Sequence, residues 1–388
     1  MLWFFINQFV VRQGLVGALL AQWLLPFYRQ TREWAKSQDM SDALYFTILL
    51  SCVHTGMYVV INLRKYLCLQ LMWSCIMCLV RVVEFVFVSS ISLTSLPLFP
   101  HAAYFVCDTY KLFPSAKLYR KPYMEPKPDL LRRLGLEEVL GQVFVGPLMS
   151  YYAFPTLFEP YLHDFDNARQ EPTFGATVWT LVFFTIANEF IFYWLHRSLH
   201  SKALYKYIHK QHHEFSGSVG YAAEYSHPLE NIFVNQLSVM AGVLLLPKLY
   251  APPNDKCHLL VFLIWIAVRL YETYEGHSGY SFLLGVITTI TKDADHQHDS
   301  NKNDGSTCVS TVGKKIVFYL TGAYAMAHHD FHHTHNQGNF ASPFMDWIFG
   351  TMDHYQNISG IDGYVQLKDK DNYRSKRRLS PDGHGKSD

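Results

Sequence analysis

Long apolar stretches constrain the fold of this chain more than any other feature of its sequence. Stretches of about 20 mostly apolar residues suffice to cross the hydrocarbon core of a bilayer as a helix, which satisfies its backbone hydrogen bonds internally. Such stretches cover residues 43–63, 67–99, 139–160, 174–195, 232–250 and 258–274. We therefore expect an all-α, integral membrane helical bundle, and the 67–99 stretch leaves open whether it makes one span or two.

The composition supports a membrane protein and argues against a nucleic-acid partner. Charged residues make up 17% of the 388 residues, against about 25% in an ordinary soluble protein. The formal net charge is only +1, whereas binding to nucleic-acid phosphates needs a clustered basic surface. Residues 1–28 are largely apolar but contain Arg12 and no small-residue cleavage signal. This pattern favours a signal anchor or an interfacial helix over a cleaved signal peptide.

Polar connections set the expected order of the chain across the membrane. Residues 111–133 combine seven Lys or Arg residues with four prolines, which predicts a basic cytoplasmic loop without regular helix. The connections at 163–171 and 251–255 are poor in Lys and Arg, so each joins a hairpin that begins and ends in the cytoplasm. The expected parts are N-terminal membrane segments (1–110), a basic cytoplasmic loop (111–138), a catalytic domain (139–356) with a polar insertion (285–320), and a polar tail (357–388).

Three histidine clusters adjoin the apolar stretches. The first cluster is HRSLH (196–200), the second is HKQHH (209–213) and the third is HDFHH (329–333). The first two lie within one stretch, HRSLHSKALYKYIHKQHH (196–213). On a helix, positions i, i+3 and i+4 share a face, so each cluster can direct its imidazoles to one point. Because both hairpins return to the cytoplasm, we expect the clusters to meet there. The histidines are His196, His200, His209, His212, His213, His329, His332 and His333.

The number of histidines predicts two metal ions. Imidazole suits zinc, copper and iron, whereas magnesium and calcium prefer carboxylates. A structural zinc takes four ligands, so eight histidines are too many for one ion. A single HxxxH or HxxHH pattern is also typical of a solvated helix face, but three of them beside membrane segments indicate a metal site. The scarcity of carboxylates in these clusters favours a histidine-rich non-haem di-iron centre that activates O2.

The order HRSLH, HKQHH and HDFHH around two membrane hairpins resembles the fatty acid hydroxylase/sterol desaturase superfamily, and within it the C4-methylsterol oxidases. The resemblance covers roughly residues 139–356. It is also carried by LYKYIHK (204–210), EYSHPLE (224–230), RLYET (269–273), GHSGY (276–280), GNF (338–340) and MDWIFGT (345–351). It implies that the eight histidines bind two irons, that His227 and His277 are further ligands, and that His328 is a secondary member of the third cluster.

Some of these residues have a plain alternative role. Without the resemblance, His227 is typical of a helix start before Pro228, and His277 of a glycine-flanked turn. Glu189 lies in a membrane segment, where a charge is unfavourable unless it is paired, so we expect it to orient a ligand histidine as an acceptor. Similar candidates, which solvated helix faces explain almost as well, are Glu224, Glu230 and Glu272.

The resemblance also implies an activity. It implies an O2-dependent oxidoreductase of the endoplasmic reticulum membrane that receives electrons from NAD(P)H through cytochrome b5 and its reductase. The expected substrate is a sterol, oxidised at its C4 methyl group in sterol biosynthesis; the alternatives are sterol C5 desaturation and fatty acid or sphingolipid hydroxylation. A membrane zinc carrier without redox chemistry is an alternative of another class. A carrier would place ionisable residues along a path across the bilayer, whereas nearly all these histidines are expected at one face.

Overall fold

Helices make up nearly all regular structure in the part of the chain that the computed structural model describes, which confirms the all-α prediction. That part comprises residues 6–63, 127–163, 171–215, 220–250, 255–279, 323–336 and 338–352. The predicted membrane stretch at 67–99, the polar insertion at 285–320 and the polar tail at 357–388 lie outside the described residues.

The N-terminal part consists of η1 (Ile6–Leu15), α2 (Val16–Ser37) and α3 (Asp42–Leu63). The middle part contains α6 (Pro128–Val139), η4 (Leu140–Val145), α7 (Gly146–Ala153), η5 (Phe154–Phe158) and α8 (Phe174–Leu199). Short turns follow, namely η6 (Tyr205–His209), η7 (His212–Glu214), η8 (Gly220–Glu224), α9 (Pro228–Glu230) and η9 (Asn231–Gln236). The last helices are α10 (Leu237–Leu249), α11 (Leu259–His277), α14 (Ala323–His335) and α15 (Pro343–Ile348). Two parallel two-residue strands, β1 (Leu162–His163) and β2 (Cys257–His258), pair beside the start of α11.

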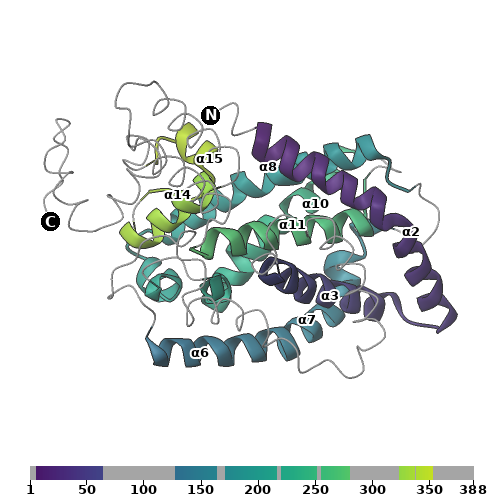
Figure 1. Ribbon diagram of the computed structural model, residues 1–388, viewed down its shortest axis with the longest axis horizontal. Helices are drawn as coiled ribbons and strands as arrows, with labels where there is room; N and C mark the ends of the chain where they lie inside the picture. The colour runs from purple at the N-terminus through teal and green to yellow at the C-terminus, as the bar shows by residue number, and fades with distance from the viewer. Residues whose placement is uncertain are drawn as a thin grey trace, which may run out of the picture.

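Helix α11 lies in the middle of the bundle, where it contacts α2, α3, α8 and α14 (Figure 1). Its first eight residues, LLVFLIWI, are all buried, as expected for a helix that is apolar on every side. Trp265 is fully buried, and its Nε1 donates to the carbonyl of Val239 in α10 at 3.0 Å. The apolar core of the described part therefore follows α11 towards its C-terminal end, where His277 lies.

Two glycines allow other helices to approach α8 closely. A Cβ atom on Gly242 of α10 would lie 2.8 Å from the Cα of Phe184, and one on Gly14 of η1 would lie 2.8 Å from Val182 Cγ2. Both distances are too short for a side chain without movement of the neighbour. Thr173 precedes helix α8, and its side chain accepts a hydrogen bond from the backbone N–H of Ala176, which caps the start of the helix. The helix that ends in the first histidine cluster is thus fixed at its start and along its sides.

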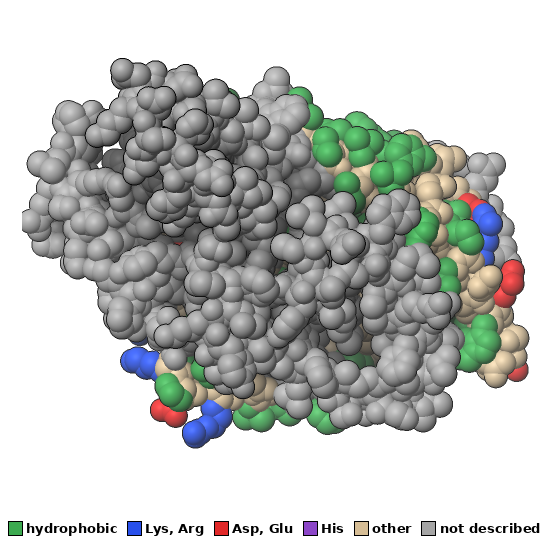
Figure 2. All heavy atoms as spheres, viewed as in Figure 1, with side chains coloured by type: hydrophobic (Ala, Val, Ile, Leu, Met, Phe, Trp, Pro, Cys, Tyr) green, Lys and Arg blue, Asp and Glu red, His purple; other side chains and the backbone are tan. Residues whose placement is uncertain are grey.

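Among the described residues, three helical runs are long and apolar enough to cross a membrane: Phe9–Ser37, Phe174–Leu199 and Pro228–Leu249. The last two cover the predicted stretch at 174–195 and all of the stretch at 232–250 except its final residue, Tyr250. Apolar side chains gather at the upper right of the face drawn in Figure 2, where Figure 1 places α2. The exposed apolar residues in the first half of the run Phe9–Ser37 include Leu15, Val16, Leu19 and Trp23. Such an apolar surface is what a bilayer requires of a spanning helix.

Two predicted stretches take a more divided or more central form than expected, and one expectation is corrected. The stretch at 139–160 is divided among η4, α7 and η5, with Pro147 in the first turn of α7 and Pro155 in the first turn of η5. The stretch at 258–274 forms the central helix α11, whose second half carries charged residues. The expectation of no regular helix through 111–133 is wrong at its end, because α6 begins with Pro128. Proline is compatible with the first helical position, where its missing N–H would have no helical partner.

Candidate metal centre

The three histidine clusters meet in two adjacent groups. The first group consists of His196, His200, His209, His213 and His332. The second group consists of His212, His277, His329 and His333. Within each group, one ring nitrogen of every histidine lies within 4.8 Å of the corresponding nitrogen of the others. Each group draws on segments far apart in the chain, so both depend on the packing of α8, α11, α14 and the η6–η7 turns.

Neighbouring histidines in the sequence alternate between the groups. In α14, His329 and His333 belong to the second group and His332 to the first. In the turns, His212 belongs to the second group and His213 to the first. The rings of His213 and His333, from different groups, have centroids only 4.8 Å apart. The two groups therefore form one continuous centre with two foci.

Hydrogen bonds at the outer ring nitrogens fix the tautomers of two histidines in the second group. Nδ1 of His277 donates to the carbonyl of Thr273 at 2.8 Å, and Nδ1 of His212 donates to the carbonyl of Tyr225 at 3.1 Å. A carbonyl can only accept, so in a neutral imidazole each Nδ1 carries the hydrogen and each Nε2 presents a lone pair. These two Nε2 atoms lie 3.3 Å apart. Two lone pairs at that distance repel each other unless a cation lies between them.

The first group is arranged in the same way. Nδ1 of His332 donates to the carbonyl of Gly338 at 2.6 Å, and Nδ1 of His196 donates to the carbonyl of Phe340. Nε2 of His332 is buried without a hydrogen-bond partner, and Nε2 of His196 lies 3.0 Å from Nε2 of His209. Nitrogens held about 2.1 Å from one ion at right angles to each other lie about 3.0 Å apart. The spacing and the tautomers therefore fit bound metal ions, and an all-imidazole donor set suits iron, zinc or copper.

Burial keeps these imidazoles in the neutral form that binds metal. Desolvation lowers the pKa of His212 to about 4, that of His277 to about 3 and that of His200 to about 2. Desolvation, followed by repulsion from neighbouring histidines, lowers the pKa of five more well below its usual value; these are His209, His213, His329, His332 and His333. These groups need lose no proton at neutral pH before they bind a metal ion.

In the described part of the chain, one carboxylate contacts a histidine of the first group directly. Oε1 of Glu230 lies 2.9 Å from Nδ1 of His209, and both side chains are buried. A carboxylate in this position fixes the orientation of the ring and raises the basicity of the other nitrogen. Only the EYSHPLE segment and the proximity of Glu230 to the histidine clusters signalled this role in the sequence.

The other carboxylates expected to orient histidines contact residues outside the two histidine groups. Glu189 accepts from the backbone N–H of Ser342 at 3.2 Å and lies 3.4 Å from Arg269. Glu272 pairs with Arg269 at 2.6 Å, and Glu224 accepts from the hydroxyl of Tyr274. Glu189 therefore reaches the loop that holds His196, and does so through Ser342.

Two histidines named in the sequence prediction, His227 and His328, lie outside both groups. Nδ1 of His227 accepts from the backbone N–H of Leu229 at 3.2 Å and caps α9, which is the helix-start role that its sequence context suggests. Nε2 of His328 lies 3.0 Å from Oδ2 of Asp346, and both side chains are fully buried. Sequence reasoning missed Asp346 as a functional candidate, although the MDWIFGT segment that contains it carries the resemblance.

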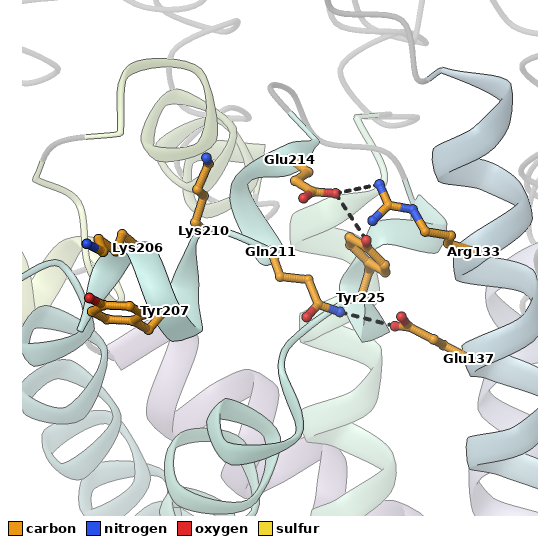
Figure 3. Close-up of a pocket in the computed structure, with 8 residues that line it drawn as sticks. All are labelled: Arg133, Glu137, Lys206, Tyr207, Lys210, Gln211, Glu214 and Tyr225. Carbon is orange, nitrogen blue, oxygen red and sulfur yellow. Dashed lines mark hydrogen bonds and ion pairs between the residues drawn. The ribbon is translucent and has the colours of Figure 1, made fainter. Parts of the chain in front are cut away.

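An open surface pocket lies beside the η6 and η7 turns (Figure 3). On one wall, Arg133 and the hydroxyl of Tyr225 donate to Glu214 at 3.0 and 3.1 Å. Lys206 and Lys210 project from the other side, as Figure 3 shows. No histidine of either group lines this pocket, so we do not assign it to the metal centre.

Comparison with known proteins adds to this geometry. The family model for fatty acid hydroxylase matches residues 181–351. Methylsterol monooxygenase 2-1 of Arabidopsis thaliana is 31% identical over 49% of this chain and 64% of its own length, so the match spans less than two thirds of that relative. Methylsterol monooxygenase 1 of Rattus norvegicus is 38% identical over 41% of each chain. The very-long-chain aldehyde decarbonylase GL1-11 of Oryza sativa subsp. indica is 30% identical over 66% of this chain and 80% of its own length. No solved structure matches the chain.

Proposed function

Because the chain belongs to the fatty acid hydroxylase family, we propose that it is a membrane di-iron monooxygenase that oxidises the C4 methyl group of a sterol. The observation that carries the metal centre is the pair of facing Nε2 lone pairs of His212 and His277, 3.3 Å apart. The methylsterol monooxygenases among its relatives support the choice of substrate. The proposed ligands are the nine histidines of the two groups, and His227 is left out because its Nδ1 caps α9.

The chemistry divides between the ions and the protein. Two bound irons would supply the capacity to activate O2, which side chains lack. One turnover converts a methyl group, O2, two electrons and two protons into a hydroxymethyl group and water, and further turnovers lead through the aldehyde to the carboxylate. The protein's part is to hold neutral imidazoles in fixed tautomers and to keep water from the centre. The buried donors of both groups support this role.

The proposal includes a source of electrons and a location. Electrons would come from NAD(P)H through cytochrome b5 and its reductase, and the membrane would be that of the endoplasmic reticulum. Basic residues beside the histidine turns favour the cytoplasmic side for the metal centre. These residues are Arg197, Lys202, Lys206 and Lys210.

Aldehyde decarbonylation is the second candidate function. The rice relative of that name matches 66% of this chain, more than either methylsterol monooxygenase described above. The same nine histidines would serve it, with a long-chain aldehyde in place of a sterol. Sterol C5 desaturation and fatty acid or sphingolipid hydroxylation are further activities that the same centre would support, and a zinc carrier is the alternative without redox chemistry.

Metal analysis and product analysis separate these functions. Protein purified without oxygen should contain two irons per chain and, given reductant and 18O2, should convert a 4-methylsterol to its 18O-labelled hydroxymethyl product in detergent micelles. A hydrocarbon one carbon shorter than an added aldehyde would instead support decarbonylation. One zinc, no iron and no oxidised lipid would refute the oxygenase proposal. The variant His200→Ala should lose iron and turnover, whereas the matched control His227→Ala, outside both groups, should keep both.

A further inference from the structure

The loop at residues 338–342, between α14 and α15, carries the carbonyls that hold two histidines of the first group. His332 donates to the carbonyl of Gly338 and His196 to that of Phe340. Gly338 and Asn339 both have positive φ angles, 60° and 53°. Glycine and asparagine are the residues that adopt this left-handed conformation most readily, so the chain can turn sharply here. The direction of the two carbonyls therefore depends on whatever fixes this loop.

Asp346 of α15 accepts hydrogen bonds from the loop with both carboxylate oxygens. Its Oδ1 accepts from the backbone N–H of Phe340 at 2.8 Å and from the hydroxyl of Thr351 at 2.7 Å. Its Oδ2 accepts from the backbone N–H of Ala341 at 2.9 Å and lies 3.0 Å from Nε2 of His328. Four donors compensate for the burial of this fully enclosed carboxylate, and hydrogen bonds to a charged acceptor are stronger than neutral ones.

We propose that Asp346 is a positioning residue for the metal ion of the first group. It holds the 338–342 loop so that the carbonyls of Gly338 and Phe340 orient His332 and His196, whose Nε2 atoms then converge on one point. The inference rests on the proposed function only in that the two histidine groups bind metal. It requires no particular substrate or reaction.

The second group has anchors of its own, so the effect of Asp346 is selective. His277 donates to Thr273 within its own helix, and His212 donates to Tyr225. Neither carbonyl belongs to the 338–342 loop. Loss of the hydrogen bonds from Asp346 to this loop should therefore lower metal affinity in the first group and leave metal affinity in the second group nearly unchanged. A residue that serves stability alone would lower the melting temperature and affect both ions equally.

The substitution Asp346→Asn tests this directly. The amide has nearly the shape of the carboxylate, but it loses the charge and places a donor where the carboxylate accepts. Co2+ serves as the probe, because its visible absorption reports binding without O2 or substrate. Metal-free protein with His329→Ala retains only the first group intact, and protein with His332→Ala retains only the second. Adding Asp346→Asn to each background shows which ion depends on Asp346.

We expect a 10–100-fold loss of Co2+ affinity in the His329→Ala background, the range found when outer hydrogen-bond partners of metal ligands are removed. In the His332→Ala background, we expect less than a twofold change. The milder variant Thr351→Val removes one of the four donors and leaves the loop amides in place. It should weaken the same ion by a smaller factor and guards against a failure of Asp346→Asn to fold.

Equal losses in both backgrounds, or no loss with either variant, would overturn the role of Asp346 and leave the metal centre standing. A wild-type protein that binds no Co2+ would overturn the metal centre and with it this role. The two failures are therefore distinguishable from one set of titrations.

Discussion

Mild acid should destabilise the metal-free protein strongly. Eight histidines of the two groups have a pKa lowered by burial and mutual repulsion. In the unfolded chain, an imidazole titrates near pH 6.5. Below that pH the unfolded state binds more protons than the folded state, so the free energy of unfolding falls as the pH falls from about 6.5 towards the folded values.

The size of the effect follows from proton linkage. Between pH 7.5 and 5.5, each histidine that stays neutral when folded and titrates near 6.5 when unfolded removes about 1.4 kcal/mol from the free energy of unfolding. Eight such groups together reach on the order of 11 kcal/mol, which rivals the whole stability of a typical domain, about 5–15 kcal/mol. Bound metal should protect the fold until protons displace it from the imidazoles.

Thermal melts in detergent, followed by tryptophan fluorescence, test this from pH 7.5 to 5.5 with and without metal. The variant His212→Gln removes one such histidine and should reduce the acid effect by about 1.4 kcal/mol. The control Asn188→Leu alters another buried polar side chain that does not titrate in this range, so it should shift the stability without changing its dependence on pH. Equal melting temperatures of the metal-free protein at pH 7.5 and 5.5 would refute the reasoning.

Three further predictions concern the carboxylate, the packing of α8 and the metal itself. Burial raises the pKa of Glu230 to about 9, so the side chain ionises at neutral pH only with a cation bound nearby. Glu230→Gln keeps an oxygen acceptor for His209 but cannot ionise, so metal affinity measured by competition with a chelator should fall 10–100-fold; unchanged affinity would contradict the orienting role. Gly242→Val forces a side chain against the backbone of Phe184 and should cost about 1–3 kcal/mol or more in a denaturation experiment. The matched control Gly175→Val, with open space around its Cβ position, should melt at a temperature closer to that of the wild type, and equal losses would argue against close α8–α10 packing. Removal of metal by a chelator should lower the melting temperature at pH 7.5, and Fe2+ but not Mg2+ should restore it; recovery with Mg2+ would count against an imidazole site.

The helical class and the meeting of the clusters were predictable because they depend on local patterns. Apolar length predicts spanning helices, and the spacing i, i+3, i+4 predicts a shared helix face. The division into groups of five and four histidines was not predictable in this way. His332 and His333 share a helix but belong to different groups, because the neighbours that each meets come from α8 and α11. Such a partition depends on tertiary packing, which no local spacing encodes.

The anchors of the ligands were the least predictable part of the site. Backbone carbonyls hold four of the histidines, and a carbonyl carries no signature in the sequence. The role of α11 was also obscured, since its apolar half resembles a lipid-facing span while the structure places it at the centre of the bundle. The position of Pro128 is the opposite case. A helix start at Pro128 could have been predicted, because proline suits the first helical position. The prolines that precede it in the sequence instead led to the prediction of a loop without regular helix.

The distribution of His212 and His213 between the two groups limits where the sequence can accept an inserted residue. Their Cα atoms are joined by one peptide unit, about 3.8 Å long, and their side chains belong to different foci. A single peptide unit therefore fixes the distance between the two histidine groups at this point, and a residue inserted there would move the two groups apart. A residue added to the connection between residues 277 and 328 imposes no such separation, because lengthening a loop costs little closure free energy.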